Sequence, residues 1–265
     1  MDKQFPSAWL PLTPRGVAAF ARAGLGRLWL VQFIVALLAA GVTVWFVNRA
    51  WVPVVRAAIQ QLPAQGQIRA GLLEWHGESS CRLAEGHWLA FSVNMNGAGE
   101  IRSSAHVQVE FGRDGFSIHS LLGYAEGNYP RGWIIPFNRT QLEPKWNAWK
   151  PMLLAGVMGM VLAGLMASWT ALATVYLLPV RVMGFFTNRN LDWGASWKLA
   201  GAALMPGALF MTAAILVYGL GLMDLVRLVA AFGLHFLMGW LYLLFALIFL
   251  SRDDHAAKGN PFAKA

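Results

Sequence analysis

Four long runs of apolar residues alternate with polar segments along the chain. The first, residues 28–47 (LWLVQFIVALLAAGVTVWFV), holds no charged residue. At 1.5 Å per residue, a helix of about 20 residues crosses roughly 30 Å of hydrocarbon. Three further runs, residues 152–178, 199–222 and 228–250, hold nothing more polar than Ser, Thr, Tyr or a single His. The pattern therefore predicts four transmembrane helices.

A secretory signal peptide is the competing interpretation of the first run, because basic residues precede it. Its apolar stretch is too long for such a peptide, and residues 51–62 offer no convincing small-residue cleavage site. We therefore expect the run to remain as a membrane anchor. Tryptophans at the ends of the predicted spans suit interfacial anchoring: Trp29, Trp45, Trp51, Trp146, Trp149, Trp193 and Trp197.

The polar segment between the first two runs has the pattern of short strands. Residues 54–62 still repeat apolar positions at helical spacing and predict a short continuation of the first helix, which ends at Pro63. Segments rich in β-branched and aromatic residues follow around residues 68–75, 82–95, 106–111 and 116–122.

The last two of these segments are separated by Gly112-Arg113-Asp114-Gly115, a turn sequence in which both glycines tolerate positive φ. We therefore expect a β-hairpin here. After it, the prolines and glycine of residues 129–137 predict an extended crossing rather than a regular central strand.

The predicted fold class is an α-helical integral membrane protein with four transmembrane helices and a small β-rich extracytoplasmic domain inserted between helices 1 and 2. Its expected parts are an N-terminal cytoplasmic or interfacial segment (1–27), transmembrane helix 1 (28–49), the extracytoplasmic domain (50–148), a three-helix transmembrane region (149–250, with helices at about 151–178, 199–222 and 228–250) and a cytoplasmic tail (251–265).

Charge supports this arrangement and predicts its orientation. The chain is 57% hydrophobic and 13% charged, with a formal net charge of +8. Residues 50–148 contain as many acidic as basic residues, so the excess positive charge lies around the apolar runs. Basic residues near a span resist translocation, which predicts that both termini and the loop around Asn190 are cytoplasmic. The basic residues that predict this orientation are Lys3, Arg15, Arg22, Arg27, Arg181, Arg189, Lys198, Arg252, Lys258 and Lys264.

Thr13-Pro14 has the signature of a helix start, with a hydroxyl to cap free amides and proline at the first helical position. Val17, Phe20 and Ala21 then recur at helical spacing. Either an amphipathic helix on the inner membrane surface or a plain cytoplasmic lead-in fits this pattern. A second cap is expected at Asn190 or Asp192, which would start a short helix in the loop 185–198.

The polar segment offers no site for chemistry that we can defend. Its histidines and Cys81 match no compact zinc spacing, and a single cysteine allows no intrachain disulfide. An intramembrane serine protease would need Ser196 and His235 together, yet Ser196 is expected at the cytoplasmic end of its span and His235 nearer the opposite side of the membrane. Trp197 also stands where such a motif has glycine. We therefore expect no enzyme, no metal and no cofactor.

Small residues within the predicted spans indicate close helix packing, because they let backbones approach. We expect Pro206 to bend its helix and His235 to donate a hydrogen bond to another helix. The candidate packing and partner-binding residues are Gly156, Gly159, Ala163, Pro206, His235, Gly239 and Tyr242.

The layout, with strand-like Ile68-Arg69-Ala70-Gly71-Leu72 in the inserted domain and three closing spans with Pro206 and short polar joints, resembles a loose group of uncharacterised bacterial multi-pass membrane proteins, some of them similar to Yip-type families. This resemblance implies a bacterial inner-membrane location and no catalytic residues.

We interpret the chain as a non-enzymatic accessory or assembly subunit of the membrane. Its extracytoplasmic domain and small-residue helix faces would bind partner membrane proteins or a second copy, and no nucleic acid is expected. The alternative is a small transport or lipid-handling protein that uses a cavity among helices 2–4, with Pro206 and His235 in its lining.

Overall fold

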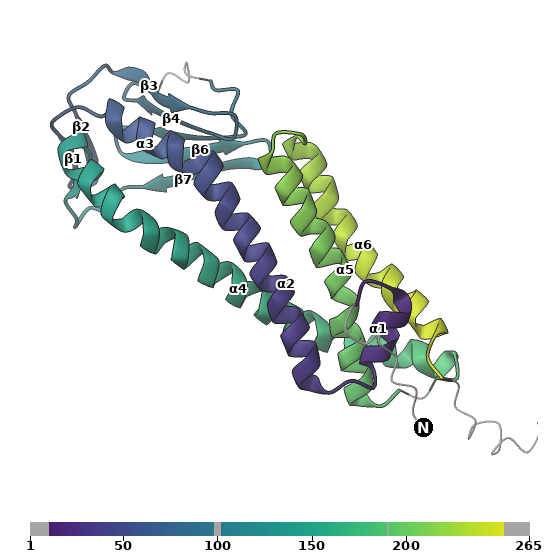
Figure 1. Ribbon diagram of the computed structural model, residues 1–265. Helices are drawn as coiled ribbons and strands as arrows, with labels where there is room; N and C mark the ends of the chain where they lie inside the picture. Colours follow the sequence, from purple (N-terminus) through teal and green to yellow (C-terminus); the bar gives the residue numbers. More distant parts are fainter. Residues whose placement is uncertain (1–10, 98–101, 190, 252–265) are drawn as a thin grey trace, which may run out of the picture. The chain divides into compact units, whose positions relative to one another are not determined.

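The computed structural model describes residues 11–97, 102–189 and 191–251 (Figure 1). The chain divides into a helical unit, Met1–Thr43 with Met158–Ala265, and a β unit, Val44–Val157. Four helices of the described residues are long and apolar enough to cross a membrane, and the β-sheet domain lies between the first of them and the next. The predictions of four such helices and of an inserted β-rich domain are therefore confirmed.

The helices are longer than the apolar runs that predict them. In particular, the second membrane-length helix begins ahead of its run and includes the tryptophan-rich segment before it. The helices are α1 (Pro14–Phe20), α2 (Leu25–Phe46), α3 (Val52–Gln61), α4 (Arg139–Phe186), α5 (Trp193–Gly219) and α6 (Leu225–Ile248).

Helix α5 is the most buried of the four membrane-length helices and contributes more residues to the core of the helical unit than any other helix. Its residues from Leu199 to Gly207 are all buried, and six of these nine are Gly, Ala or Pro. Small side chains leave room for neighbouring backbones. A Cβ built on Gly207 would lie 2.5 Å from the His235 carbonyl oxygen, so α5 and α6 meet there with no space for a side chain. Figure 1 shows these two helices side by side.

Helix α1 begins as the sequence predicts, because the Thr13 hydroxyl accepts a hydrogen bond from the Gly16 amide at 3.1 Å. Its apolar face is not available to a membrane surface. Val17 and Phe20 are fully buried in the core that includes α5 and α6. The amphipathic pattern therefore reflects packing against the chain's own helices.

The β unit opens with a helix that continues from α2. A π-helical turn, Val47–Trp51, joins α2 to α3. Pro53 explains this wider turn, since it has no amide to donate and its ring displaces the preceding carbonyl. The predicted helical continuation over residues 54–62 is confirmed. Helix α3 packs against the five-stranded sheet that is described next.

Two sheets form the rest of the β unit. One has the strand order β2-β1-β8 and the other β3-β4-β5-β6-β7, in which only the β4–β5 pair is parallel. The strands are β1 (Gly66–Arg69), β2 (Leu72–Trp75), β3 (Ser80–Glu85), β4 (Leu89–Asn94), β5 (Val107–Phe111), β6 (Gly115–Ser120), β7 (Gly123–Asn128) and β8 (Ile135–Pro136).

The predicted hairpin is confirmed as β5–β6, with Val107 opposite Ser120 and Phe111 opposite Phe116. Its glycines serve a different purpose from the one expected. Neither has a positive φ, whereas a Cβ on Gly115 would lie 2.4 Å from the Gly127 carbonyl oxygen of β7. Close approach of a third strand, which the sequence pattern did not reveal, is what requires glycine.

The segments expected as single strands at 68–75 and 82–95 each fold into two. Ala70 and Gly71 have φ of 53° and 80°, so residues 68–72, which were expected as one strand, contain a two-residue turn between β1 and β2. Paired positive φ values of this kind match the right-handed twist of a tight hairpin. The expected extended crossing contributes only the two-residue edge strand β8.

The core of the β unit joins α3 to both sheets. It contains Ala58 and Leu62 of α3 together with Ile68, Leu73, Leu83, Val93, Tyr129 and Phe137. The Tyr129 hydroxyl donates to the Gly112 carbonyl at 3.1 Å, and burial raises the pKa of this phenol. Tyr129 is therefore a neutral core residue.

Candidate functional site

The three small residues of α4 that were expected to pack face open space among the described residues. A Cβ built on Gly156 or Gly159 meets nothing within 4 Å among the described residues, and Ala163 is exposed as well. Of the 18 consecutive residues of α4 that are most apolar, only 6% are buried, against 56% of the corresponding residues of α5. Of the expected packing residues, these three therefore take no part in packing within the described chain.

The expected packing residues Pro206 of α5 and Gly239 of α6 lie in the opposite situation. Pro206 is buried, and Gly239 lies with its Cβ position 3.7 Å from both the Ala203 carbonyl oxygen and Leu204. Two further close approaches, at Gly201 and Gly207, were not among the expected sites. The signal for them was the run of small residues from Leu199 to Ala208.

His235 and Tyr242 make contacts that differ from those expected. The His235 ring is hydrogen-bonded to the Phe232 carbonyl of its own helix, and the expected bond to another helix is not among those of the described residues. The backbone carbonyl of His235, rather than its imidazole, meets α5. The Tyr242 hydroxyl donates to the Leu12 carbonyl at 3.1 Å and so ties α6 to the segment before α1.

The seven expected anchor tryptophans are exposed or half-buried, as an interfacial role would require. Two of them also make side-chain contacts within the helical unit. The Trp193 ring lies 3.9 Å from the Arg181 guanidinium carbon, and the Trp197 indole donates to the Thr174 hydroxyl at 3.1 Å. Asp192 caps α5 through the Ala195 amide, so the cap expected in this loop starts the long helix instead of a short one, while Asn190 lies outside the described residues.

The histidines and Cys81 do not converge. Within the described residues, no group of three or more His, Cys, Asp or Glu side chains is placed to hold a metal ion. The rings of His87 and His106 do meet edge to face, with centroids 4.6 Å apart, just before β4 and β5 begin. Burial raises the pKa of the half-buried Cys81 thiol, so less of it is in the reactive thiolate form at neutral pH than for an exposed cysteine.

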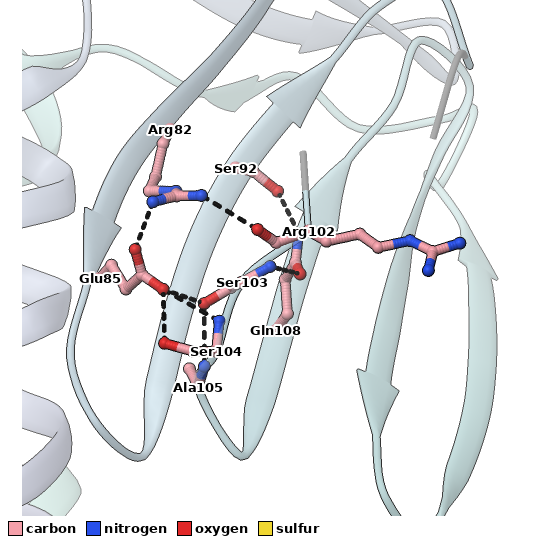
Figure 2. Close-up of polar contacts among 8 residues, drawn as sticks. All are labelled: Arg82, Glu85, Ser92, Arg102, Ser103, Ser104, Ala105 and Gln108. Atoms are coloured by element: carbon pink, nitrogen blue, oxygen red, sulfur yellow. Dashed lines mark hydrogen bonds and ion pairs between the residues drawn. The ribbon is translucent and has the colours of Figure 1, made fainter. Parts of the chain in front are cut away.

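The densest polar network lies beside the crossover from β4 to β5 (Figure 2). Glu85 accepts hydrogen bonds from the Ser103 hydroxyl at 2.6 Å and from the Ser104 amide at 3.1 Å, and it pairs with Arg82. Arg82 also donates to the Arg102 carbonyl at 3.0 Å, while Figure 2 shows the Arg102 side chain extending away from the cluster. A parallel strand pair needs such a crossover, and Glu85 fixes its returning end.

The network continues into the sheet through Gln108, which is buried. Gln108 accepts from the Ser103 amide and donates to the Ser92 hydroxyl, both at 3.0 Å. The bond from Ser103 is the largest cause of a lowered pKa at Glu85. A carboxylate that is ionised and fully bonded is a poor proton donor or acceptor at neutral pH, so the network has a structural role.

Acid should weaken this crossover. Because the pKa of Glu85 is below its ordinary value of about 4.5 in the folded chain, its contribution is present above that value and is lost as the pH falls through the lowered one. We expect Glu85→Gln to reduce the stability of the β unit at pH 7 and to make it less sensitive to acid as the pH falls below about 4.5. Thermal unfolding of the full chain at several pH values measures both effects.

The matched control is Glu126→Gln, the same change at an exposed glutamate on β7. It should leave the acid dependence as in the parent chain. Equal acid sensitivity of the parent and Glu85→Gln would contradict the structural role of this carboxylate.

Two cavities stand out. One, of about 350 Å³, lies in the β unit among Gly66, Glu74, Asn138 and their neighbours, and its polar groups are used structurally: Glu74 binds Gln67, and Asn138 binds the Gly66 carbonyl and caps α4. The other is an apolar groove of about 250 Å³ between the C-terminal ends of α4 and α6. Neither is lined by Pro206 or His235.

Comparison with protein-family models, with curated proteins and with solved structures found no match. The resemblance to Yip-type membrane proteins therefore stays a prediction.

Proposed function

We propose that the chain is a non-enzymatic membrane protein that acts as an accessory or assembly subunit. In this proposal the four long helices cross a membrane, the expected bacterial inner membrane, with both termini cytoplasmic and residues 50–148 outside. Partner membrane proteins, or a second copy, bind the free face of α4. The proposal rests on the observation that, among the described residues, this apolar helix leaves its row of small residues, Gly156, Gly159 and Ala163, without a neighbour.

Physical reasoning supports a protein partner on this face rather than lipid alone. Lipid tails pack against any apolar helix, so lipid contact does not require glycine. Glycine lowers helix propensity by about 1 kcal/mol relative to alanine, and a close-approaching backbone is what a glycine row accommodates. The buried row on α5 shows this use inside the chain, since Gly201 and Gly207 face other helices directly.

The β unit offers a second surface to the proposed partner. Strand β7 is the last strand of its sheet and is mostly exposed, so its outer backbone groups are available for pairing. Leu121 and Leu122, in the turn before it, are 71% and 69% exposed, and Tyr124 is 58% exposed. Exposed apolar side chains beside an open strand edge suit a protein contact.

The alternative, a lipid-handling or transport protein, is favoured by one observation only. The groove between α4 and α6 is apolar and opens among the helices that this alternative invokes. Pro206, in contrast, is buried within packed helices.

The proposal is tested by the mass of the purified full-length protein in mild detergent. A subunit migrates as a stable complex with itself or with another membrane protein. A monodisperse monomer that binds or moves a small molecule would favour the alternative.

The proposed topology makes a separate prediction. A reporter that is active only in the cytoplasm should work when it is fused after Ala265 or inserted near Asn190, and it should be silent near Gly97. The basic residues around the short loops are the reason. Cytoplasmic activity of the reporter at Gly97 would contradict the four-span arrangement.

A further inference from the structure

The groove between the C-terminal ends of α4 and α6 combines an apolar lining with one cationic side chain. Met183, Phe186, Leu244 and Leu247 line it, together with Ile248, Thr187 and Arg189. The Thr187 hydroxyl donates back to the Met183 carbonyl at 2.8 Å, within α4. Arg189 is therefore the group in the groove that can offer hydrogen bonds to a ligand.

The local backbone places Arg189 there. Asn188 has a φ of 51°, a left-handed conformation that ends α4 and turns the chain. Arg189 then donates to the Leu250 carbonyl just beyond α6, which fixes its guanidinium beside the groove. A guanidinium has five N–H donors, and the Nε donor of Arg189 is buried without a hydrogen-bond partner among the described residues. An unpaired buried donor is costly, and an anionic acceptor would remove that cost.

Several basic side chains at this end of the helical unit have neutral partners among the described residues. Arg15 and Arg181 lie over the rings of Phe249 and Trp193, and Lys198 donates to the Ala23 carbonyl. Arg22 likewise binds the Ser251 hydroxyl. These partners are neutral. Asp192, which is the described carboxylate nearest to Arg189 in the sequence, caps α5.

We propose that this groove binds a phospholipid with an anionic headgroup, with an acyl chain along the apolar lining and the phosphate at Arg189. Basic pockets between membrane helices are suited to such headgroups. The proposal rests on the membrane placement proposed above, but it does not depend on the protein being a subunit. Lipid selectivity tests it, whereas the mass of the complex tests the subunit role.

The experiment titrates the full-length protein in mild detergent with dioleoyl phosphatidylglycerol, dioleoyl phosphatidylcholine, glycerol phosphate and inorganic phosphate, and counts bound molecules by native mass spectrometry. We expect phosphatidylglycerol to bind most tightly. Arg189→Gln should weaken it about fivefold, as expected for loss of about 1 kcal/mol per basic residue. Arg227→Gln, the same change at an exposed arginine paired with Asp224, should have no effect.

A second variant keeps the test open if Arg189→Gln does not fold. Leu244→Trp fills the groove from its exposed side and leaves every charge in place, so it should also weaken phosphatidylglycerol. Equal binding of the two phospholipids, or equal binding of glycerol phosphate, would overturn the proposal. Binding that appears only after Asp253 and Asp254 are replaced by Asn would overturn it too, because the chain's own carboxylates would then be the occupant.

Discussion

Gly207→Ala is expected to destabilise the helical unit by about 1–3 kcal/mol, the usual cost of overpacking a close contact. The added Cβ would lie 2.5 Å from the His235 carbonyl oxygen, and real Cβ atoms do not approach backbone so closely. Because the obstacle is the backbone of α6 rather than a flexible side chain, α5 and α6 must separate. The temperature at which half of the detergent-solubilised protein aggregates, followed by size-exclusion chromatography, should fall by several degrees.

Gly233→Ala is the matched control. It makes the same change on α6, where a Cβ meets nothing within 4 Å among the described residues, and replacing glycine within a helix is favourable by about 1 kcal/mol. Its aggregation temperature should be unchanged or higher. His235→Ala should resemble the control, since the contact uses the His235 carbonyl and not the ring. A large loss for His235→Ala and none for Gly207→Ala would show that our account of this contact is wrong.

Periodicity and composition predicted the architecture because both signals are local. A run such as residues 28–47 is expected to be helical in a membrane, because lipid offers no hydrogen-bond partners to its backbone groups. The Thr13 cap and the β5–β6 hairpin were predictable for the same reason: each depends on a few consecutive residues.

Pairing between distant segments was not predictable in this way. The pattern of residues 14–21 is the same whether the apolar face of α1 meets lipid or protein, and only the tertiary structure shows that α5 and α6 cover it. Likewise, the turn at Ala70 was predicted as part of a strand, because alanine rarely adopts a positive φ and the sequence gives no sign that it does so here.

The candidate site was predicted in part. Small residues indicate that another backbone can approach closely, but they do not identify which helix does so. The same reasoning selected Gly159 and Gly239, yet Gly239 lies against α5 while Gly159 faces open space. The exposed and the buried small residues can be told apart only when their neighbouring helices are known. Gly239→Leu would therefore disturb the chain's own fold, and it does not test an interface.

Gly159→Leu is the variant that separates the subunit role from folding. Leucine fits at this position in the isolated chain, is more apolar than glycine and favours a helix, so membrane insertion and folding should be preserved. A partner backbone seated on the row would be displaced by the new side chain. We expect the complex to dissociate, with an affinity reduced by a factor of about 5 to about 150, which corresponds to about 1–3 kcal/mol of overpacking.

The control is Gly233→Leu, an identical change at another exposed position on a different helix, α6. Analytical ultracentrifugation in mild detergent should show the parent and Gly233→Leu at the mass of the complex and Gly159→Leu at the mass of the free chain. Both variants add the same apolar surface, so a general effect of leucine on detergent binding would move them together. If Gly159→Leu keeps the complex intact, the partner does not bind the glycine row of α4, and the exposed edge strand β7 is the next surface to test.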